Sequence, residues 1–152
     1  MGRSDKEITD KSAIEAIIQK SLVCRLALSD GAHPYVVPLC FGYGGNCLYF
    51  HSAPEGRKID MIRANSSVCF EFDANTEIVK GEEACYWGMR YQSVIGFGNA
   101  FLVEDIEEKR TALGIIMSHY SAPSSSLPED ILRHVAVIKV EIESMTGKQS
   151  GY

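Results

Sequence analysis

Apolar and polar positions alternate along much of the chain with the two-residue period of a β-strand. Val68, Phe70 and Phe72, for example, alternate with more polar neighbours, as in a strand with one buried face. The same period predicts strands at Leu22–Ser29, Tyr35–Tyr43, Cys47–His51, Tyr91–Glu104 and His134–Ile142, and more weakly at Glu77–Val79 and Ala84–Trp87. Because these strands are short and separated by turn residues, the pattern favours a mainly β fold of six or seven antiparallel strands forming a small barrel.

Three segments change to the 3.6-residue period of a helix. Ser12 and Glu15 form a capping box that predicts a helix start near the N-terminus. A short helix is predicted from Ala53 to about Asn65, and Asp105 with Glu108 caps a third. The outer two helices have clear apolar stripes, formed by Ile14, Ile17 and Ile18 and by Leu113, Ile116, Met117 and Tyr120.

The longest predicted strand carries two glycines and follows an aromatic loop. Gly96 and Gly98 lie on one face, where missing side chains would allow a sharp bend or the close approach of another group. Trp87 and Tyr91 flank the loop Gly88–Arg90. Three roles stay open for these aromatic residues: internal packing, covering a planar ligand, or contact with a partner subunit.

The length of 152 residues fits one domain. We therefore expect a single domain at 1–152, with an N-terminal helical segment at 1–21 and a barrel with helices at 22–148. The stretch Ser121–Pro128 is rich in serine and proline and is predicted to be a surface loop.

Charge and hydropathy narrow the possible partners and location. The formal net charge is −5 and the sequence pI about 5.4, which is the wrong sign for a general nucleic-acid binder. No stretch approaches the ~20 apolar residues of a membrane span, and the polar N-terminus does not resemble a signal peptide. We expect a cytoplasmic protein with no nucleic-acid or membrane partner.

The sequence offers little support for a disulfide scaffold, a metal site or a serine hydrolase. Its five cysteines are an odd number without paired spacing, and the four histidines also lack ligand spacing. We therefore predict free cysteines that act as small buried side chains, and no metal site. The nucleophile motif G-x-S-x-G is also missing.

The most informative run is His51–Lys58, where a strand gives way to the short helix. Ser52 is predicted as the N-cap, with Pro54 in the first turn and Glu55 completing a capping box. A helix start presents free N–H groups and positive dipole charge, and Arg57 and Lys58 add two cations. This favours a phosphate cradle, the alternative being a solvated helix turn. His51 is either a structural residue or a group at the rim of the same pocket.

Several runs together resemble the pyridoxamine 5′-phosphate oxidase-like FMN-binding split-barrel family, and within it the 5-nitroimidazole-resistance (Nim) proteins. The similarity covers roughly residues 22–148. It is carried by the order and spacing of Tyr35–Tyr43, Leu48–Lys58, Tyr91–Gly96 and Met145–Lys148. The resemblance implies a six-stranded antiparallel split barrel that forms a homodimer, with FMN at the subunit interface.

The resemblance also implies which residues contact FMN. The strand with Pro38, Leu39, Cys40 and Phe41 would run along the flavin ring through its backbone. The phosphate would be held by His51, Ser52, Arg57 and Lys58, and the other subunit would add Gln92 and Ser93. His51 is the candidate catalytic residue beside the flavin.

The function implied is that of an FMN-dependent oxidoreductase of the Nim type, which reduces a small electrophile such as a nitroimidazole or another nitroaromatic compound. The chain ends at Tyr152 and its only tryptophan is Trp87. Because true pyridoxamine phosphate oxidases carry a C-terminal segment rich in Arg, His and Trp, that activity is not expected here. Two alternatives remain: a protein that binds or senses flavin without turnover, and a haem-binding relative with His51 or His119 as the ligand.

Overall fold

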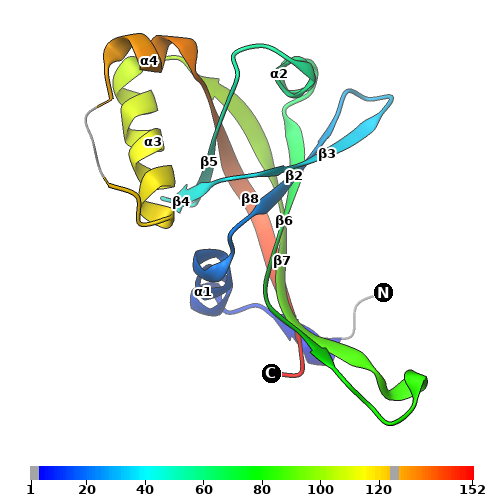
Figure 1. Cartoon of the computed structure of the whole chain (residues 1–152). Helices are drawn as coiled ribbons and strands as arrows, with labels where there is room; N and C mark the ends of the chain where they lie inside the picture. The colour runs from blue at the N-terminus through cyan, green and yellow to red at the C-terminus, as the bar shows by residue number, and fades with distance from the viewer. Residues whose placement is uncertain (1–3, 124–126) are drawn as a thin grey trace.

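The computed structural model describes residues 4–123 and 127–152. Eight strands form one antiparallel sheet, which runs in the order β3-β2-β6-β7-β8-β5-β4, with β1 pairing to β8. Figure 1 shows this sheet wrapping into an open barrel with helices at its sides. The strands are β1 (Glu7–Ile8), β2 (Cys24–Ser29), β3 (Pro34–Leu39), β4 (Gly42–Gly44), β5 (Cys47–Ser52), β6 (Ser67–Val79), β7 (Gly88–Val103) and β8 (Ala136–Ser150).

The expected antiparallel, mainly β barrel is therefore confirmed, with more strands than the six of the family pattern. The additional strands include β1 and β4, which have only two and three residues. Phe41, Phe50, Phe70 and Phe72 are fully buried at the centre of the main core. The alternation at Val68, Phe70 and Phe72 places all three side chains inside, as predicted.

In the part of the chain that the structure describes, four α-helices flank the sheet: α1 (Lys11–Lys20), α2 (Arg57–Ala64), α3 (Ile106–His119) and α4 (Glu129–His134). The apolar stripe of α1 packs into the main core, while α3 and α4 form a second apolar cluster against Val103 and Val137. Figure 1 shows α3 and α4 on one side of the barrel and α2 near its top. Among the helices of residues 4–123 and 127–152, none is long and apolar enough to cross a membrane.

The predicted starts of the first two helices were wrong. Asp10, and not Ser12, caps α1, because the Asp10 carboxylate accepts from the N–H of Ala13. The second helix begins at Arg57, four residues later than expected, because Gly56 turns the chain first. The hydroxyl of Ser52 donates to the carbonyl of Ala53 and caps no helix. The third prediction is confirmed, since the carboxylate of Asp105 accepts from the N–H of Glu108.

The remaining corrections are local. Ala84–Tyr86 is a 3-10 turn (η2) and not a strand, and His134 ends α4 instead of opening β8. The N-terminal segment also holds a short 3-10 turn, η1 (Ser4–Lys6), and β1, so it is only partly helical. All five cysteines are free, but of the five only Cys24 is buried, which corrects the expectation that each is a core residue. In the predicted surface loop Ser121–Pro128, positions 124–126 lie outside the described residues.

The two glycines of β7 allow close packing, as predicted. A Cβ on Gly96 would lie 2.1 Å from the ring of Phe70, and one on Gly98 would lie 2.3 Å from the backbone oxygen of Glu141. The register between β7 and β8 also shifts at Gly98. Missing side chains here let the core ring and the neighbouring strand approach β7 directly.

The end of β6 and the beginning of β7 leave the barrel as a two-stranded ribbon. We call residues 77–90 the arm. Figure 1 shows it projecting from the lower end of the molecule. All its residues are exposed except Gly81, which is half-buried.

Candidate functional site

The start of α2 depends on a glycine. Gly56 has φ 134 and ψ 177, a backbone region that is essentially restricted to glycine. The first helical hydrogen bond runs from the N–H of Asp60 to the carbonyl of Gly56. The N–H groups of Arg57 and Lys58 therefore precede the intrahelical ladder and are available to an anion at the positive end of the helix.

Arg57 stands at the mouth of a pocket between α2 and the β2–β3 hairpin. Its guanidinium carbon lies 5.2 Å from the centre of the Tyr35 ring, a cation–π contact that orients the side chain. The pocket has a volume of about 430 Å³ and is lined by Asp30, His33, Pro34, Tyr35, Arg57 and Met61. A guanidinium carries N–H donors that suit a bidentate acceptor such as phosphate.

Lys58 is half-buried beside Arg57 in the sequence. Burial lowers the pKa of its ammonium group below the ordinary 10.5, because the charged form loses hydration. An anion bound next to Lys58 would restore that lost stabilisation. A desolvated cation at a helix start is a suitable group for holding a phosphate.

His51 and Ser52 end β5, one strand away from the outer edge formed by β4. His51 is exposed, and strand alternation places it on the same side of β5 as Tyr49. Tyr49 packs against the cluster formed with α3. The chain therefore positions His51 by its backbone pairing with Val137 of β8, and its ring is open to solvent.

The segment Pro38–Phe41 links β3 to β4. Pro38 and Cys40 are exposed, Leu39 is half-buried, and Phe41 is fully buried between Phe72 and His119. The Phe41 N–H donates to the hydroxyl of Tyr120, 3.1 Å away. Any planar ligand along this segment would therefore meet the exposed side at Pro38 and Cys40, whereas Phe41 anchors the segment to the core.

Gln92 and Ser93 are neighbours in β7 but face opposite sides of the sheet. The Gln92 amide donates to Gln149 at 3.1 Å and accepts from Asn75, at the base of the arm. Ser93 lines an outer pocket of about 330 Å³ with Ile95, Thr146, Lys148, Ser4, Glu7 and Gly147. Of this predicted pair, Ser93 is therefore the residue that faces an open surface.

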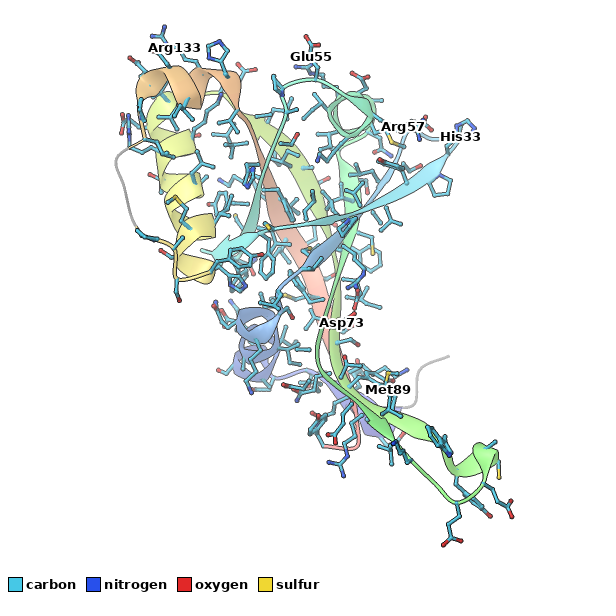
Figure 2. The ribbon with its side chains drawn as sticks, viewed as in Figure 1. His33, Glu55, Arg57, Asp73, Met89 and Arg133 are labelled. Carbon is cyan, nitrogen blue, oxygen red and sulfur yellow. The ribbon has the colours of Figure 1, made fainter. Side chains whose placement is uncertain are left out.

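Within one chain, two of the predicted site residues, Arg57 and Ser93, line separate pockets. Arg57 lines the pocket at the β2–β3 hairpin, whereas Ser93 lines the pocket beside β1 and pairs across the sheet with Asp73. Figure 2 shows Arg57 and Asp73 well apart, with Arg57 near the top of the molecule. A single chain therefore does not bring the Arg57 and Ser93 groups into contact.

Sequence reasoning missed the residues that hold the site in place. Tyr35 supports Arg57, and Tyr120 joins Phe41 to Leu22, whose carbonyl accepts from the Tyr120 hydroxyl at 2.7 Å. Burial raises the pKa of Tyr120 to about 12, which extends to higher pH the range in which its hydroxyl is protonated and can donate. No local signal identifies these partners, because each contact joins separate elements of the fold.

His119, a candidate haem ligand, is engaged in the core. Its Nε2 donates to the carbonyl of Ser21 at 2.7 Å, and its ring packs against that of Phe41 in a tilted arrangement, with the ring centres 4.2 Å apart. Only Nδ1 would remain for a metal. Within residues 4–123 and 127–152, no three His, Cys, Asp or Glu side chains converge as a metal site.

Comparison with known proteins relates this arrangement to a family. The family model described as pyridoxamine 5′-phosphate oxidase matches residues 10–149. An uncharacterised protein of Rhizobium meliloti is 32% identical over 73 residues, which make up 46% of this chain and 48% of that protein. The chain thus aligns with about half the length of this curated relative.

Solved structures with the same fold support this family assignment. A candidate 5-nitroimidazole antibiotic resistance protein of Bacteroides thetaiotaomicron is 42% identical, with a TM-score of 0.85 and coverage of 94% of this chain and 86% of that chain. The FAD and heme binding protein of Mycobacterium smegmatis is 18% identical, with a TM-score of 0.82 and coverage of 97% and 74%. The match over nearly the whole length shows that this chain belongs to the pyridoxamine 5′-phosphate oxidase family and has its split-barrel fold.

Proposed function

We propose that this protein is an FMN-dependent oxidoreductase of the Nim type, which reduces a small electrophile such as a nitroaromatic compound. The observation that carries the proposal is the cationic start of α2, where Gly56, Arg57 and Lys58 offer a cradle for a phosphate monoester. The similarity to the candidate 5-nitroimidazole resistance protein supports the choice of substrate class.

The chemistry of these residues fits FMN. Arg57 and Lys58 would neutralise a doubly charged phosphate, and their backbone N–H groups, which make no hydrogen bond within α2, would donate to it. The exposed face at Pro38 and Cys40 provides a surface for a planar ring. When bound, FMN would supply the redox chemistry, while the protein contributes binding, orientation and electrostatics. His51 is the proposed proton donor to the substrate.

The separation of Arg57 and Ser93 supports a site shared between two copies of the chain. The outer face of the sheet also exposes the large apolar residues Val36, Ile95, Phe97 and Phe101. Exposed apolar surface of this kind on a sheet is typical of an interface between subunits. We therefore propose a homodimer in which Ser93 completes the partner's flavin site, while Gln92, on the opposite side of β7, is hydrogen-bonded to Gln149.

The first experiment is an absorption spectrum of the purified protein after FMN addition and gel filtration. Flavin bands that co-elute with the protein support the cofactor. Because each charge-assisted hydrogen bond contributes about 1.5–3 kcal/mol, replacing both Arg57 and Lys58 with Ala should weaken FMN binding by roughly 100-fold or more. An unchanged affinity would show that the phosphate lies elsewhere.

Turnover then separates an enzyme from a protein that only holds flavin. NADH or NADPH is mixed with the FMN-loaded protein in a stopped-flow instrument, with and without a nitroimidazole. Repeated flavin reduction and reoxidation by the nitro compound is the expected result. Flavin that stays oxidised, or that fails to cycle, would instead assign the protein to flavin binding or sensing.

A further inference from the structure

The arm has an apolar surface that its own chain does not cover. Five of its large apolar side chains are 38% to 70% exposed: Ile78, Val79, Tyr86, Trp87 and Met89. An isolated two-stranded ribbon is marginally stable in water. Within the arm, the Lys80 ammonium lies 6.0 Å from the centre of the Trp87 ring. Trp87 is still 51% exposed, so its own chain covers it only in part, and covering a ligand or meeting a partner remain the two roles for its free surface.

The base of the arm is held firmly to the barrel. The Tyr152 hydroxyl donates to the carbonyl of Asn75 at 2.7 Å, and Gln92 links Asn75 to Gln149. At the tip, Gly81 packs closely against the backbone and Cβ of Tyr86. These contacts tie the base of the arm to the C-terminal residues Gln149 and Tyr152 and hold the tip together.

The apolar surface of the arm is continuous with the outer face of the barrel. Met89, Ile95, Phe97 and Phe101 are all odd positions of β7, and strand alternation places them on one side. Ile78 pairs directly with Met89 across the arm. One apolar stripe therefore runs from the arm onto the face proposed for the dimer.

The same molecule has a pocket at its other end. The pocket of about 430 Å³ beside Tyr35 and Arg57 lies at the β2–β3 hairpin. Figure 2 shows His33 and Arg57 at the top of the molecule and Met89 toward the bottom, on the same side. The Arg57 guanidinium already makes one cation–π contact, with Tyr35, and a guanidinium can also pair with a second aromatic ring.

We propose that the arm docks on a second copy of this chain and inserts Trp87 into the pocket between α2 and the β2–β3 hairpin. This inference rests on the dimer of the proposed function. In the proposed dimer, a two-fold axis perpendicular to β7 would place the arm of each copy at the β2–β3 hairpin of the other. The same contact would therefore form twice. Trp87 would then stack on Arg57 and close the phosphate cradle from solvent. The pocket also contains Asp30 and His33, which provide polar partners at its rim.

Cross-linking tests this contact directly, because the arm already carries the exposed Cys85. In a His33→Cys variant, a short bis-maleimide should join Cys85 of one copy to the new thiol of the other, as peptide mass mapping would reveal. An Ile131→Cys variant, on exposed α4, is the matched control and should give no such product. A dimer that yields no link between positions 85 and 33 would overturn the docking.

Replacing the aromatic side chains of the arm with alanine gives an independent test, because it measures their effect on dimer stability. Because aromatic anchors at interfaces contribute strongly, Trp87→Ala with Tyr86→Ala should raise the dimer dissociation constant roughly 30-fold or more in sedimentation experiments. Tyr86→Ala keeps the Cβ that packs on Gly81, and circular dichroism verifies the fold. An unchanged dissociation constant would refute the role of the arm.

FMN retention, measured in the same samples, separates the two proposals. If the wild-type protein retains no FMN but its dimer depends on the arm, the flavin function is refuted and the docking stands. If the protein retains FMN but its dimer dissociation constant is unchanged by the arm substitutions, the docking is refuted and the flavin function stands.

Discussion

Gly56 holds a backbone conformation that other residues adopt only with strain. A Cβ there would meet nothing within 4 Å, so space is not the constraint. Its φ of 134 alone requires glycine. Beside it, Lys58 has a lowered pKa because of burial. Both properties belong to single residues, and each has its own test.

Gly56→Ala should destabilise the protein by about 1–3 kcal/mol through backbone strain. Gly114→Ala is the matched control, because Gly114 lies inside α3, and a Cβ there also meets nothing within 4 Å. Alanine in a helix interior should stabilise by about 0.5–1 kcal/mol. Chemical denaturation of the three proteins measures both effects. Equal changes of the same sign would contradict the strain at Gly56.

The FMN affinity should fall at alkaline pH. Lys58 in the free protein loses its proton below the ordinary 10.5, whereas a bound phosphate favours the charged form. Binding therefore takes up a proton as pH rises through the lowered pKa, and the affinity declines there. Lys58→Arg should remove this decline, because a guanidinium stays protonated. Fluorescence titrations across pH measure it, with Lys11→Arg as the control. A decline that persists in Lys58→Arg would assign it to another group.

The elements are joined by a small number of long-range contacts. The end of α3 holds the β3–β4 connection through Tyr120, whose hydroxyl donates to Leu22 and accepts from Phe41. In the sheet, Gly96 lets the ring of Phe70 pack directly against β7. The position of the exposed Pro38–Cys40 segment thus depends on helix and sheet together.

Tyr120→Phe should destabilise the protein by about 1–3 kcal/mol, because the Phe41 N–H loses its acceptor in a partly buried place. Tyr86→Phe, at an exposed tyrosine of the arm, is the control and should have little effect. Thermal unfolding compares the two. Wild-type stability in Tyr120→Phe would mean that water replaces the hydroxyl at no cost.

Gly96→Ala should destabilise the fold by about 1–3 kcal/mol, because its Cβ would overlap the fully buried Phe70 ring. The double variant Gly96→Ala with Phe70→Leu relieves that overlap. Denaturation should therefore show a smaller effect of Gly96→Ala in the Phe70→Leu background. Simple addition of the two single effects would argue against the direct contact.

At the scale of the whole molecule, the two halves of the proposed flavin site lie in different parts of one chain. Complementation tests whether they meet between copies. A chain with Arg57→Ala and Lys58→Ala and a chain with Ser93→Trp should each lose FMN binding. In an equal mixture, half of the dimers are mixed and each has one intact site, so about a quarter of the sites should recover. No recovery after subunit exchange would place the site within one chain.

The sequence located the main strands of the barrel, although it joined β3 and β4 into one strand at Tyr35–Tyr43 and predicted a strand at the 3-10 turn η2. It also predicted the third helix start and the close packing at Gly96. These features depend on alternation and capping, which act over a few residues. It also marked Arg57 and Lys58 as candidate phosphate ligands, a prediction that awaits FMN titration. It misplaced the caps of α1 and α2, because Ser12 and Ser52 are acceptable caps locally and the backbone at Asp10 and Gly56 decides otherwise.

The tertiary structure alone decided which groups meet. Tyr120 reaches Phe41 across 79 positions of sequence, and Arg57 stacks on Tyr35 because α2 packs beside the β2–β3 hairpin. It also left the arm uncovered while burying the stripe of α1. Such contacts arise when the sheet wraps around its core, and a local pattern carries no record of which distant side chain that wrapping brings near.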